Sequence, residues 1–400
     1  MIMRAHYIGL LLCTFLALPS GAMAEPQAAA RPPGYEKLRV TRAEGPPSFK
    51  DSDTTQFLAV DSKGHPALLR GDTLEVFRLG ADASFDRRVG KLACVRSSDS
   101  GPAYAAAMDP AGSTWAVSSP SELGLCDFIK EQRPPGLDWL ISSLAYSRSG
   151  PLVVVTALGP PPDATNYFKR TEPRVFGLKD DRWQPIVSVP IRVSNKKLPA
   201  DRLAAQADLN AQAMETLAES KAESDAPICT TLKGEIWLAS WNSYRLQRVS
   251  ASEKPEQPER EIVVGSGEVE WPKVAKKEHE SEAGDRKAQG AEGIPSTVGG
   301  AFPRAVVRGL ACGREIYLVV STAYGLALDR FSPSQNLLER VLLDGVTVSS
   351  GPMTAALGGD QLWLGGRFAV DGLWRISLED LATAHWKPVK DVKVDGKPMM

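Results

Sequence analysis

The sequence predicts an all-β protein built from a short repeated unit. Three clear copies, residues 352–378, 227–249 and 307–331, each contain an apolar run, a turn with glycine, a second run with an aromatic residue, and a third run. Fainter copies precede them. The residues aligned just after the turns are Leu68, Trp115, Val153, Trp237, Tyr317 and Trp363, and the turn glycines are Gly64, Gly112, Gly150, Gly234, Gly313 and Gly359. Six copies, repeated roughly every 40–45 residues, are typical of β-propeller blades. We therefore expect a six-bladed β-propeller, with a seven-bladed ring as the alternative.

The first 24 residues have the pattern of a cleavable signal peptide. Arg4 precedes an uncharged apolar run, Tyr7 to Leu18, and small residues follow that fit cleavage before Glu25. The run is too short to span a membrane, and no later segment approaches the roughly 20 apolar residues that a span needs. We expect a periplasmic or extracellular protein without a membrane span.

The remaining chain is divided into a lead-in, residues 25–54, and one propeller domain, residues 55–400. Residues 35–42 alternate weakly and are a candidate for a strand that closes the ring against the last blade. The charge is nearly balanced, with 47 basic and 48 acidic residues. This balance argues against a nucleic acid or an anionic lipid surface as the partner.

Four cysteines remain after cleavage, and they allow three pairings in an oxidising compartment. Cys94 and Cys126 are the first choice for a disulfide because they fall in neighbouring strands of the early blades. Cys229 and Cys312 occupy inner strands of successive blades, but they are offset by three residues when the blades are aligned. For these two, the alternative is a pair of buried free thiols.

Each blade is expected to contain four strands, of which the innermost ends just before the turn glycine. In the fourth blade the predicted strands are 227–232, 235–241, 244–249 and 260–265. The second blade lacks a predicted outer strand, because Pro134, Pro135 and Gly136 occupy its place. The aligned aromatic residues should pack between neighbouring sheets, with Trp115 and its counterparts buried.

Three stretches do not fit the repeat. They are residues 158–172, residues 194–226 and the charge-dense residues 266–303. Within the second stretch, apolar residues at helical spacing predict an amphipathic helix over 199–222. We expect 266–303 to be a disordered insertion. All three follow a second strand or connect two blades, and such segments share one face of a propeller, so we expect ligand binding on that face.

Aromatic and cationic residues in loops of that face form the candidate binding site. The candidates are Trp241, Tyr244, Tyr324, Arg367 and Phe368. Aromatic side chains stack on a ligand and arginine pairs with an anion, which suits a small molecule, a sugar or a peptide. The first blade adds Arg70 and Asp72 to the same loops, and ordinary loop surface is the alternative interpretation.

Motifs for catalysis or metal binding are missing from the sequence. His65, His279 and His385 have no partner at the spacing of metal ligands, and no nucleophile elbow or phosphate loop occurs. Asp51 and Asp53 form an Asp-x-Asp pair, which favours a turn over a calcium site. We expect no catalytic residue and no cofactor.

The segments GEIWLAS (234–240) and GDQLWLGG (359–366) resemble the blades of two-component-regulator, NHL and gluconolactonase-like propellers. The resemblance implies the fold. Gluconolactonase-like enzymes hold a divalent metal in the channel with Glu, Asn and Asp, and no matching set is present here; the inner strands offer Asp61 and Asp109, both near turns. The sequence therefore favours a binding or interaction scaffold. The alternative is a metal-dependent hydrolase or lyase of lactones or polysaccharides that uses the propeller channel.

Overall fold

The structure is a computed structural model. The residues that it describes are 36–43, 46, 55–80, 85–94, 103–119, 122–137, 140–156, 171–190, 227–239, 244–249, 260–264, 307–322, 325–346, 352–368 and 372–399. The predicted signal peptide (1–24), the predicted helix (199–222) and the charged insertion (266–303) lie outside these residues. Within the described part of the chain, no helix is long and apolar enough to cross a membrane.

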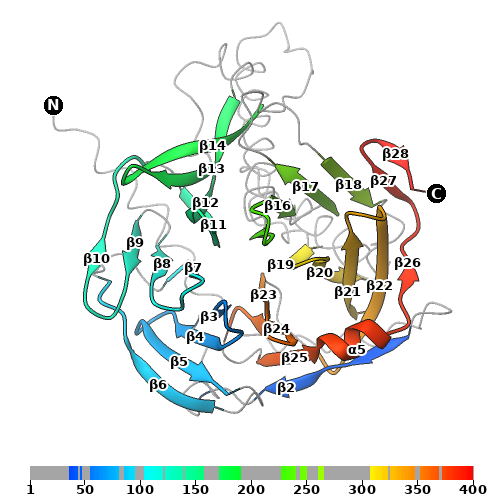
Figure 1. Ribbon diagram of the computed structural model, residues 1–400, viewed down its shortest axis with the longest axis horizontal. Coiled ribbons are helices and arrows are strands. Elements are labelled where there is room, and N and C mark those ends of the chain that lie inside the picture. The colour runs from blue at the N-terminus through cyan, green and yellow to red at the C-terminus, as the bar shows by residue number, and fades with distance from the viewer. Residues whose placement is uncertain are drawn as a thin grey trace, which may run out of the picture.

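Six antiparallel sheets are arranged as blades in a ring around a central axis (Figure 1). Blade one contains β3 (Gln56–Val60), β4 (Pro66–Arg70), β5 (Glu75–Leu79) and β6 (Phe85–Lys91). Blade two contains β7 (Ala105–Met108), β8 (Trp115–Ser118), β9 (Leu123–Cys126) and β10 (Glu131–Gln132). Blade three contains β11 (Leu140–Ser147), β12 (Gly150–Thr156), β13 (Thr171–Lys179) and β14 (Arg182–Pro190).

The second half of the ring follows the same order from the inside outward. Blade four contains β15 (Ile228–Thr230), β16 (Ile236–Ala239), β17 (Arg245–Val249) and β18 (Arg260–Val264). Blade five contains β19 (Val307–Cys312), β20 (Ile316–Thr322), β21 (Gly325–Ser332) and β22 (Leu337–Asp344). Blade six contains β23 (Met353–Gly358), β24 (Gln361–Gly366) and β25 (Leu373–Ser377) from the C-terminal part of the chain. The six-bladed prediction is confirmed.

Both ends of the chain add strands on the outside of the ring. The N-terminal strand β2 (Thr41–Ala43) pairs with β25 as the fourth strand of blade six, and β1 (Lys37–Arg39) runs parallel to β22 of blade five. After the short helix α5 (Leu378–Thr383), three C-terminal strands follow. They are β26 (Lys387–Pro388) on β22, β27 (Val392–Val394) on β18, and β28 (Lys397–Pro398) on β27. The last blade is thus completed from the first part of the chain, which closes the ring.

The core is divided into six apolar clusters, one at each junction between neighbouring blades. Trp115 packs with residues of blade one, Trp237 lies 5.8 Å from the ring centroid of Phe331 in blade five, and Trp363 packs with Leu68 of blade one. These three indole rings are at most 1% exposed. Because the recurring aromatic residue fills a junction between sheets, it is a structural feature of the ring, as predicted.

The turns between the first and second strands are tight. Gly64 has φ +84°, and a Cβ there would lie 2.4 Å from the backbone nitrogen of Gly359, so another residue would clash with blade six. Gly112, Gly150, Gly234 and Gly359 also have positive φ, whereas Gly313 does not. Five of the six turn glycines therefore have a backbone conformation that favours glycine.

Two predicted boundaries need correction. Blade two has an outer strand after all, although β10 has two residues and ends before Pro134, which lacks an N–H to continue the ladder. The carbonyl of Pro135 instead accepts a hydrogen bond from the N–H of Trp183 in blade three. Thr171 and Glu172, assigned from the sequence to an inserted loop, belong to β13, where they pair with β14.

Candidate functional site

A cavity of about 340 Å³ occupies the centre of the ring and is lined by the inner strands of all six blades. Its wall is mainly apolar and contains many small side chains, among them Ala106, Ala145, Ala355 and Ala356. The described lining residues include no Asp, Glu or His. The channel therefore presents apolar surface with few charged groups.

The charged side chains of the cavity lie where the inner strands begin, whereas Tyr146 and Thr230 line its other end. We define the channel mouth by Gln56, Tyr104, Arg308 and Arg367, which all line the cavity. Gln56 begins β3, Tyr104 precedes β7, and Arg308 is the second residue of β19. Arg367 follows β24, in the connection from the second to the third strand of blade six. Such connections lie on the face where inner strands start, and this is the face on which the sequence placed the binding site.

Gln56 holds the loop of blade six in place from blade one. Its side chain is buried, and Nε2 lies 3.1 Å from the carbonyl oxygen of Gly366, 3.0 Å from that of Phe368 and 3.3 Å from that of Gly372. Its backbone N–H also donates to the carbonyl of Arg367, with an N–O distance of 2.8 Å. The backbone around Arg367 is therefore ordered by contacts across the closure of the ring.

The side chain of Arg367 lies among aromatic rings. Its guanidinium carbon is 5.0 Å from the ring centroid of Tyr104 and 6.0 Å from that of Phe368. Both separations are within the range of cation–π attraction, which orients the guanidinium plane. No carboxylate of the described residues forms an ion pair with Arg367. The geometry presents a positive charge, fixed by its aromatic neighbours, at the mouth of an apolar channel.

Arg308 is the second cation at the mouth. Its side chain is 8% exposed, and its Nε donates to the hydroxyl of Ser321 on β20. It lies on blade five, whereas Arg367 extends from blade six toward blade two. The mouth thus combines two guanidinium groups from different blades.

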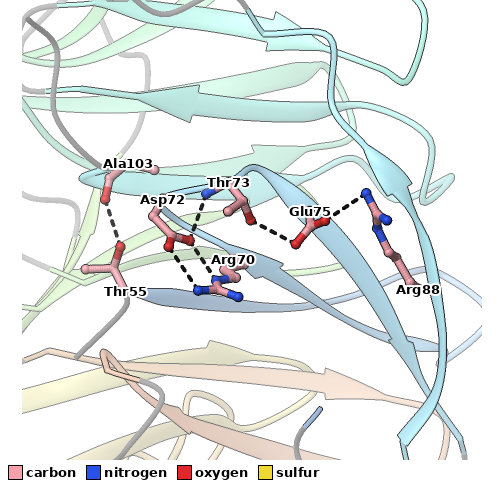
Figure 2. Close-up of polar contacts among 7 residues, drawn as sticks. All are labelled: Thr55, Arg70, Asp72, Thr73, Glu75, Arg88 and Ala103. Carbon is pink, nitrogen blue, oxygen red and sulfur yellow. Dashed lines mark hydrogen bonds and ion pairs between the residues drawn. The ribbon is translucent and has the colours of Figure 1, made fainter. Parts of the chain in front are cut away.

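Charged groups beside the mouth are paired within blade one (Figure 2). Arg70 donates to both oxygens of Asp72, at 2.8 and 3.1 Å, and Asp72 also accepts the N–H of Thr73 at 2.7 Å. Glu75 accepts the hydroxyl of Thr73 and pairs with Arg88 at 2.7 Å. Arg70 and Asp72, proposed from the sequence as loop candidates, therefore stabilise the turn between β4 and β5.

The five predicted binding residues differ in where the structure places them. Arg367 and Phe368 lie together at the mouth, whereas Trp241 and Tyr324 lie outside the described residues. Tyr244 corrects the prediction, because it is 2% exposed and its hydroxyl donates to Oδ2 of Asp329 at 2.7 Å. Burial raises the pKa of Tyr244 well above its usual value, and the negative charge of Asp329 raises it further. Tyr244 is a residue of the junction between blades four and five and is not accessible to a ligand.

Three residues of the channel mouth were not predicted from the sequence: Gln56, Tyr104 and Arg308. A signal was present for two of them, because Gln56 and Tyr104 each stand eight residues before a turn glycine. Aligning the starts of the inner strands, in addition to their ends, would have placed both at the mouth. Arg308 has no such match, since blade five differs in the length of this segment.

At the opposite ends of the inner strands, two carboxylates stabilise turns. Oδ1 of Asp61 accepts the N–H groups of Lys63 and His65, and Oδ1 of Asp109 accepts those of Ser113 and Thr114. Burial raises the pKa of Asp61, but the N–H groups of His65 and Lys63 outweigh it and hold the pKa below its usual value. Among the described residues, no group of three or more His, Cys, Asp or Glu is arranged to hold a metal.

Two disulfides connect neighbouring blades. Cys94, which follows β6, bonds to Cys126 of β9, with a Cα–Cα distance of 5.4 Å. Cys229 of β15 bonds to Cys312 of β19, with a Cα–Cα distance of 5.6 Å, and both line the cavity. The alternative of free thiols at Cys229 and Cys312 is not what the structure contains.

No model of a known protein family matches this chain, and no curated protein is similar to it in sequence. Among solved structures, virginiamycin B lyase from Staphylococcus aureus is 10% identical, with a TM-score of 0.41 over 82% of this chain and 97% of that chain. The PQQ-bound aldose sugar dehydrogenase from Streptomyces coelicolor is 12% identical, with a TM-score of 0.41 over 89% and 96% of the two chains. A protein of Bacteroides fragilis described as exported is 8% identical, with a TM-score of 0.44 over 81% and 82%. These neighbours are β-propellers, and the similarity is one of fold alone.

Proposed function

We propose that this chain is an exported β-propeller that binds a small molecule in its central channel, through the channel mouth. One observation carries the proposal: the inner strands enclose a cavity of about 340 Å³ with a mainly apolar wall and two arginines, Arg308 and Arg367, at one end. Small-molecule sites combine mostly apolar walls with a few convergent polar groups, in volumes of roughly 300–1,000 Å³. The channel is near the lower end of that range, which favours a compact ligand.

The composition of the wall favours a small organic molecule over a sugar or a peptide. Alanine and leucine side chains bury apolar ligand surface, at about 25 cal/mol per Å² removed from water. A sugar or a peptide backbone carries polar groups along its whole length, and each one buried without a partner costs about 1–3 kcal/mol. The described charged side chains of the lining, Arg308 and Arg367, both lie at the mouth, so they suit a ligand with one charged or strongly polar end.

Export is supported by the cysteine chemistry. All four cysteines that follow the predicted cleavage site are paired. Disulfides persist in oxidising compartments and are rare in the cytosol. Together with the signal-peptide pattern of residues 1–24, the pairing supports a periplasmic or extracellular location.

The metal-dependent hydrolase or lyase is the less favoured function. It needs oxygen or nitrogen ligands converging in the channel, and the described lining contains no Asp, Glu or His. Asp61 and Asp109, the acids that the sequence offered for this role, hold the N–H groups of turns at the other end of the inner strands. The described donor set therefore does not fit a divalent metal.

The proposal is tested with the neutral fluorescent probe N-phenyl-1-naphthylamine. We expect saturable binding to the mature protein and a loss of at least tenfold in affinity in Ala356→Phe, which fills the channel. Ala145→Phe fills the channel from another blade, so a loss of binding in both variants is not explained by a folding defect at one site. Cooperative thermal unfolding verifies that each variant is folded. Ile129→Ser is the matched control. It removes an apolar side chain that is 89% exposed, to which the probe would bind outside the channel. Equal binding by the wild type and both filled variants would refute the proposal.

A further inference from the structure

Arg367 differs from the arginines that form ion pairs within the described part of the chain. The arginines that pair with a carboxylate among the described residues are Arg70, Arg88, Arg133, Arg245, Arg248, Arg330 and Arg340. Arg367 instead is half-buried between Tyr104 and Phe368 and lines the cavity. No counter-ion for it is found among the described residues, and burying much of an arginine is costly unless an anion pairs with it.

The position of Arg367 is fixed before any ligand arrives. Gln56 contacts the carbonyls on both sides of it, and Thr55 forms an isolated β-bridge with Phe368. The aromatic rings then restrict the guanidinium itself. Preorganisation of this kind lowers the entropic cost of binding, because the loop and side chain lose little freedom when a ligand arrives.

The electrostatic environment favours a negative ligand. Arg308 contributes a second positive charge to the same mouth, where its Nε is held by Ser321. The described lining contains no acidic side chain. Between low-dielectric apolar walls, the positive charge of Arg367 is felt more strongly than on an open surface.

We propose that the ligand of the channel is an organic anion, whose carboxylate or sulfonate pairs with Arg367 while its apolar body lies against the channel wall. This inference rests on the proposed function and specifies its ligand class. The planar guanidinium offers two parallel N–H donors to the two oxygens of such a group.

The test compares two probes that differ by one anionic group. 1-Anilinonaphthalene-8-sulfonate is N-phenyl-1-naphthylamine with a sulfonate added, so the pair isolates the contribution of the charge. We expect the wild type to bind the sulfonate probe more tightly than the neutral one. Arg367→Gln should weaken the sulfonate probe by about tenfold or more and leave the neutral probe within about twofold.

Arg314→Gln is the matched control. Arg314 is exposed in the turn between β19 and β20, at the opposite end of the inner strands, and its loss changes the net charge of the protein by the same amount. We expect it to bind both probes as the wild type does. Because the sulfonate probe also binds partly unfolded protein, each variant must first show cooperative thermal unfolding.

The outcomes distinguish the two proposals. Unchanged sulfonate binding in Arg367→Gln, with neutral binding still blocked by Ala356→Phe, overturns the anion inference and leaves channel binding standing. An equal loss of affinity for both probes in Arg367→Gln also overturns the anion inference, because Arg367 would then shape the channel without pairing with the anionic group. If neither Ala356→Phe nor Ala145→Phe lowers the affinity for either probe, channel binding itself is refuted.

Discussion

The hydroxyl of Tyr244 donates a hydrogen bond of 2.7 Å to Oδ2 of Asp329 across the junction between blades four and five. Arg340 completes the contact, because its Nε and Nη2 donate to the two oxygens of Asp329 at 2.7 and 2.8 Å. Asp329 is fully buried and Arg340 is 2% exposed. A buried carboxylate is tolerated here because three donors from two blades surround it.

Removing the hydroxyl of Tyr244 or the carboxylate of Asp329 should destabilise the protein, by different amounts. Tyr244→Phe removes one donor and leaves Arg340 in place, so the free energy of unfolding should fall by about 1–2 kcal/mol. Asp329→Ala leaves Arg340 buried without its counter-ion and should cost about 3–5 kcal/mol. Urea unfolding monitored by tryptophan fluorescence measures both changes. Glu339→Gln, in the more exposed Arg330 pair, is the control and should cost at most about 1 kcal/mol; equal costs for all three variants would contradict this ranking.

The two disulfides should contribute comparable stability, because loop length affects their contribution only slowly. The Cys229–Cys312 bond spans 83 residues and the Cys94–Cys126 bond spans 32 residues. In the chain-entropy model these loops correspond to about 4.5 and 3.7 kcal/mol. We expect Cys229→Ser/Cys312→Ser and Cys94→Ser/Cys126→Ser to lower the free energy of unfolding by up to these amounts. Unfolding curves of the oxidised wild type that do not shift on adding dithiothreitol would argue against both bonds.

The ring was predictable because its signals are local. A turn glycine followed by a large apolar residue recurs in the sequence, and this residue is aromatic in four of the six copies. Each copy specifies two strands and one buried side chain, as at Gly234 and Trp237. The inner and second strands of blade four differ from their predicted bounds by only a few residues. Local pattern therefore determines the blades, and their number follows by counting.

The site was less predictable because it depends on contacts between the ends of the domain. Gln56 and Phe368 are separated by 312 residues and meet only because the ring closes. Tyr244 was misplaced for a different reason. It shares the inward face of its strand with Leu246, two residues on, and both are at most 2% exposed. Tyr244 was assigned to a loop although this alternation of side chains continues one residue before the start of β17.

Asp61 should make stability depend on pH in the acidic range. Its pKa is lower in the folded protein than its usual value, so the unfolded chain binds the proton more readily. The stabilisation is therefore complete above the usual pKa of about 3.9 and is lost as the pH falls toward the lower folded value. Asp61→Asn keeps an oxygen acceptor but does not titrate. We expect a stability difference from the wild type at neutral pH that narrows at about pH 3, measured by urea unfolding; a constant difference would contradict the role of the charge.

The C-terminal strands should stabilise blades four and five from outside. Val392 of β27 is 4% exposed and packs in the cluster at their junction, as does Val389, which is 3% exposed. Val392→Ala should lower the free energy of unfolding by about 1–3 kcal/mol, because it removes buried methyl groups and leaves a cavity. Lys393→Ala, at the exposed next position, is the matched control and should change stability by less than about 0.5 kcal/mol.

Ending the chain at Ala384 extends this prediction to the whole C-terminal segment. The truncation removes β26, β27 and β28, so β18 loses the partner that pairs with Ile262, Val263 and Val264. An uncovered outer strand presents unpaired N–H and C=O groups, which favour association with other chains. We expect the truncated protein to unfold at lower urea concentration and to form larger species in light scattering. A monomer as stable as the wild type would show that β27 covers blade four without stabilising it.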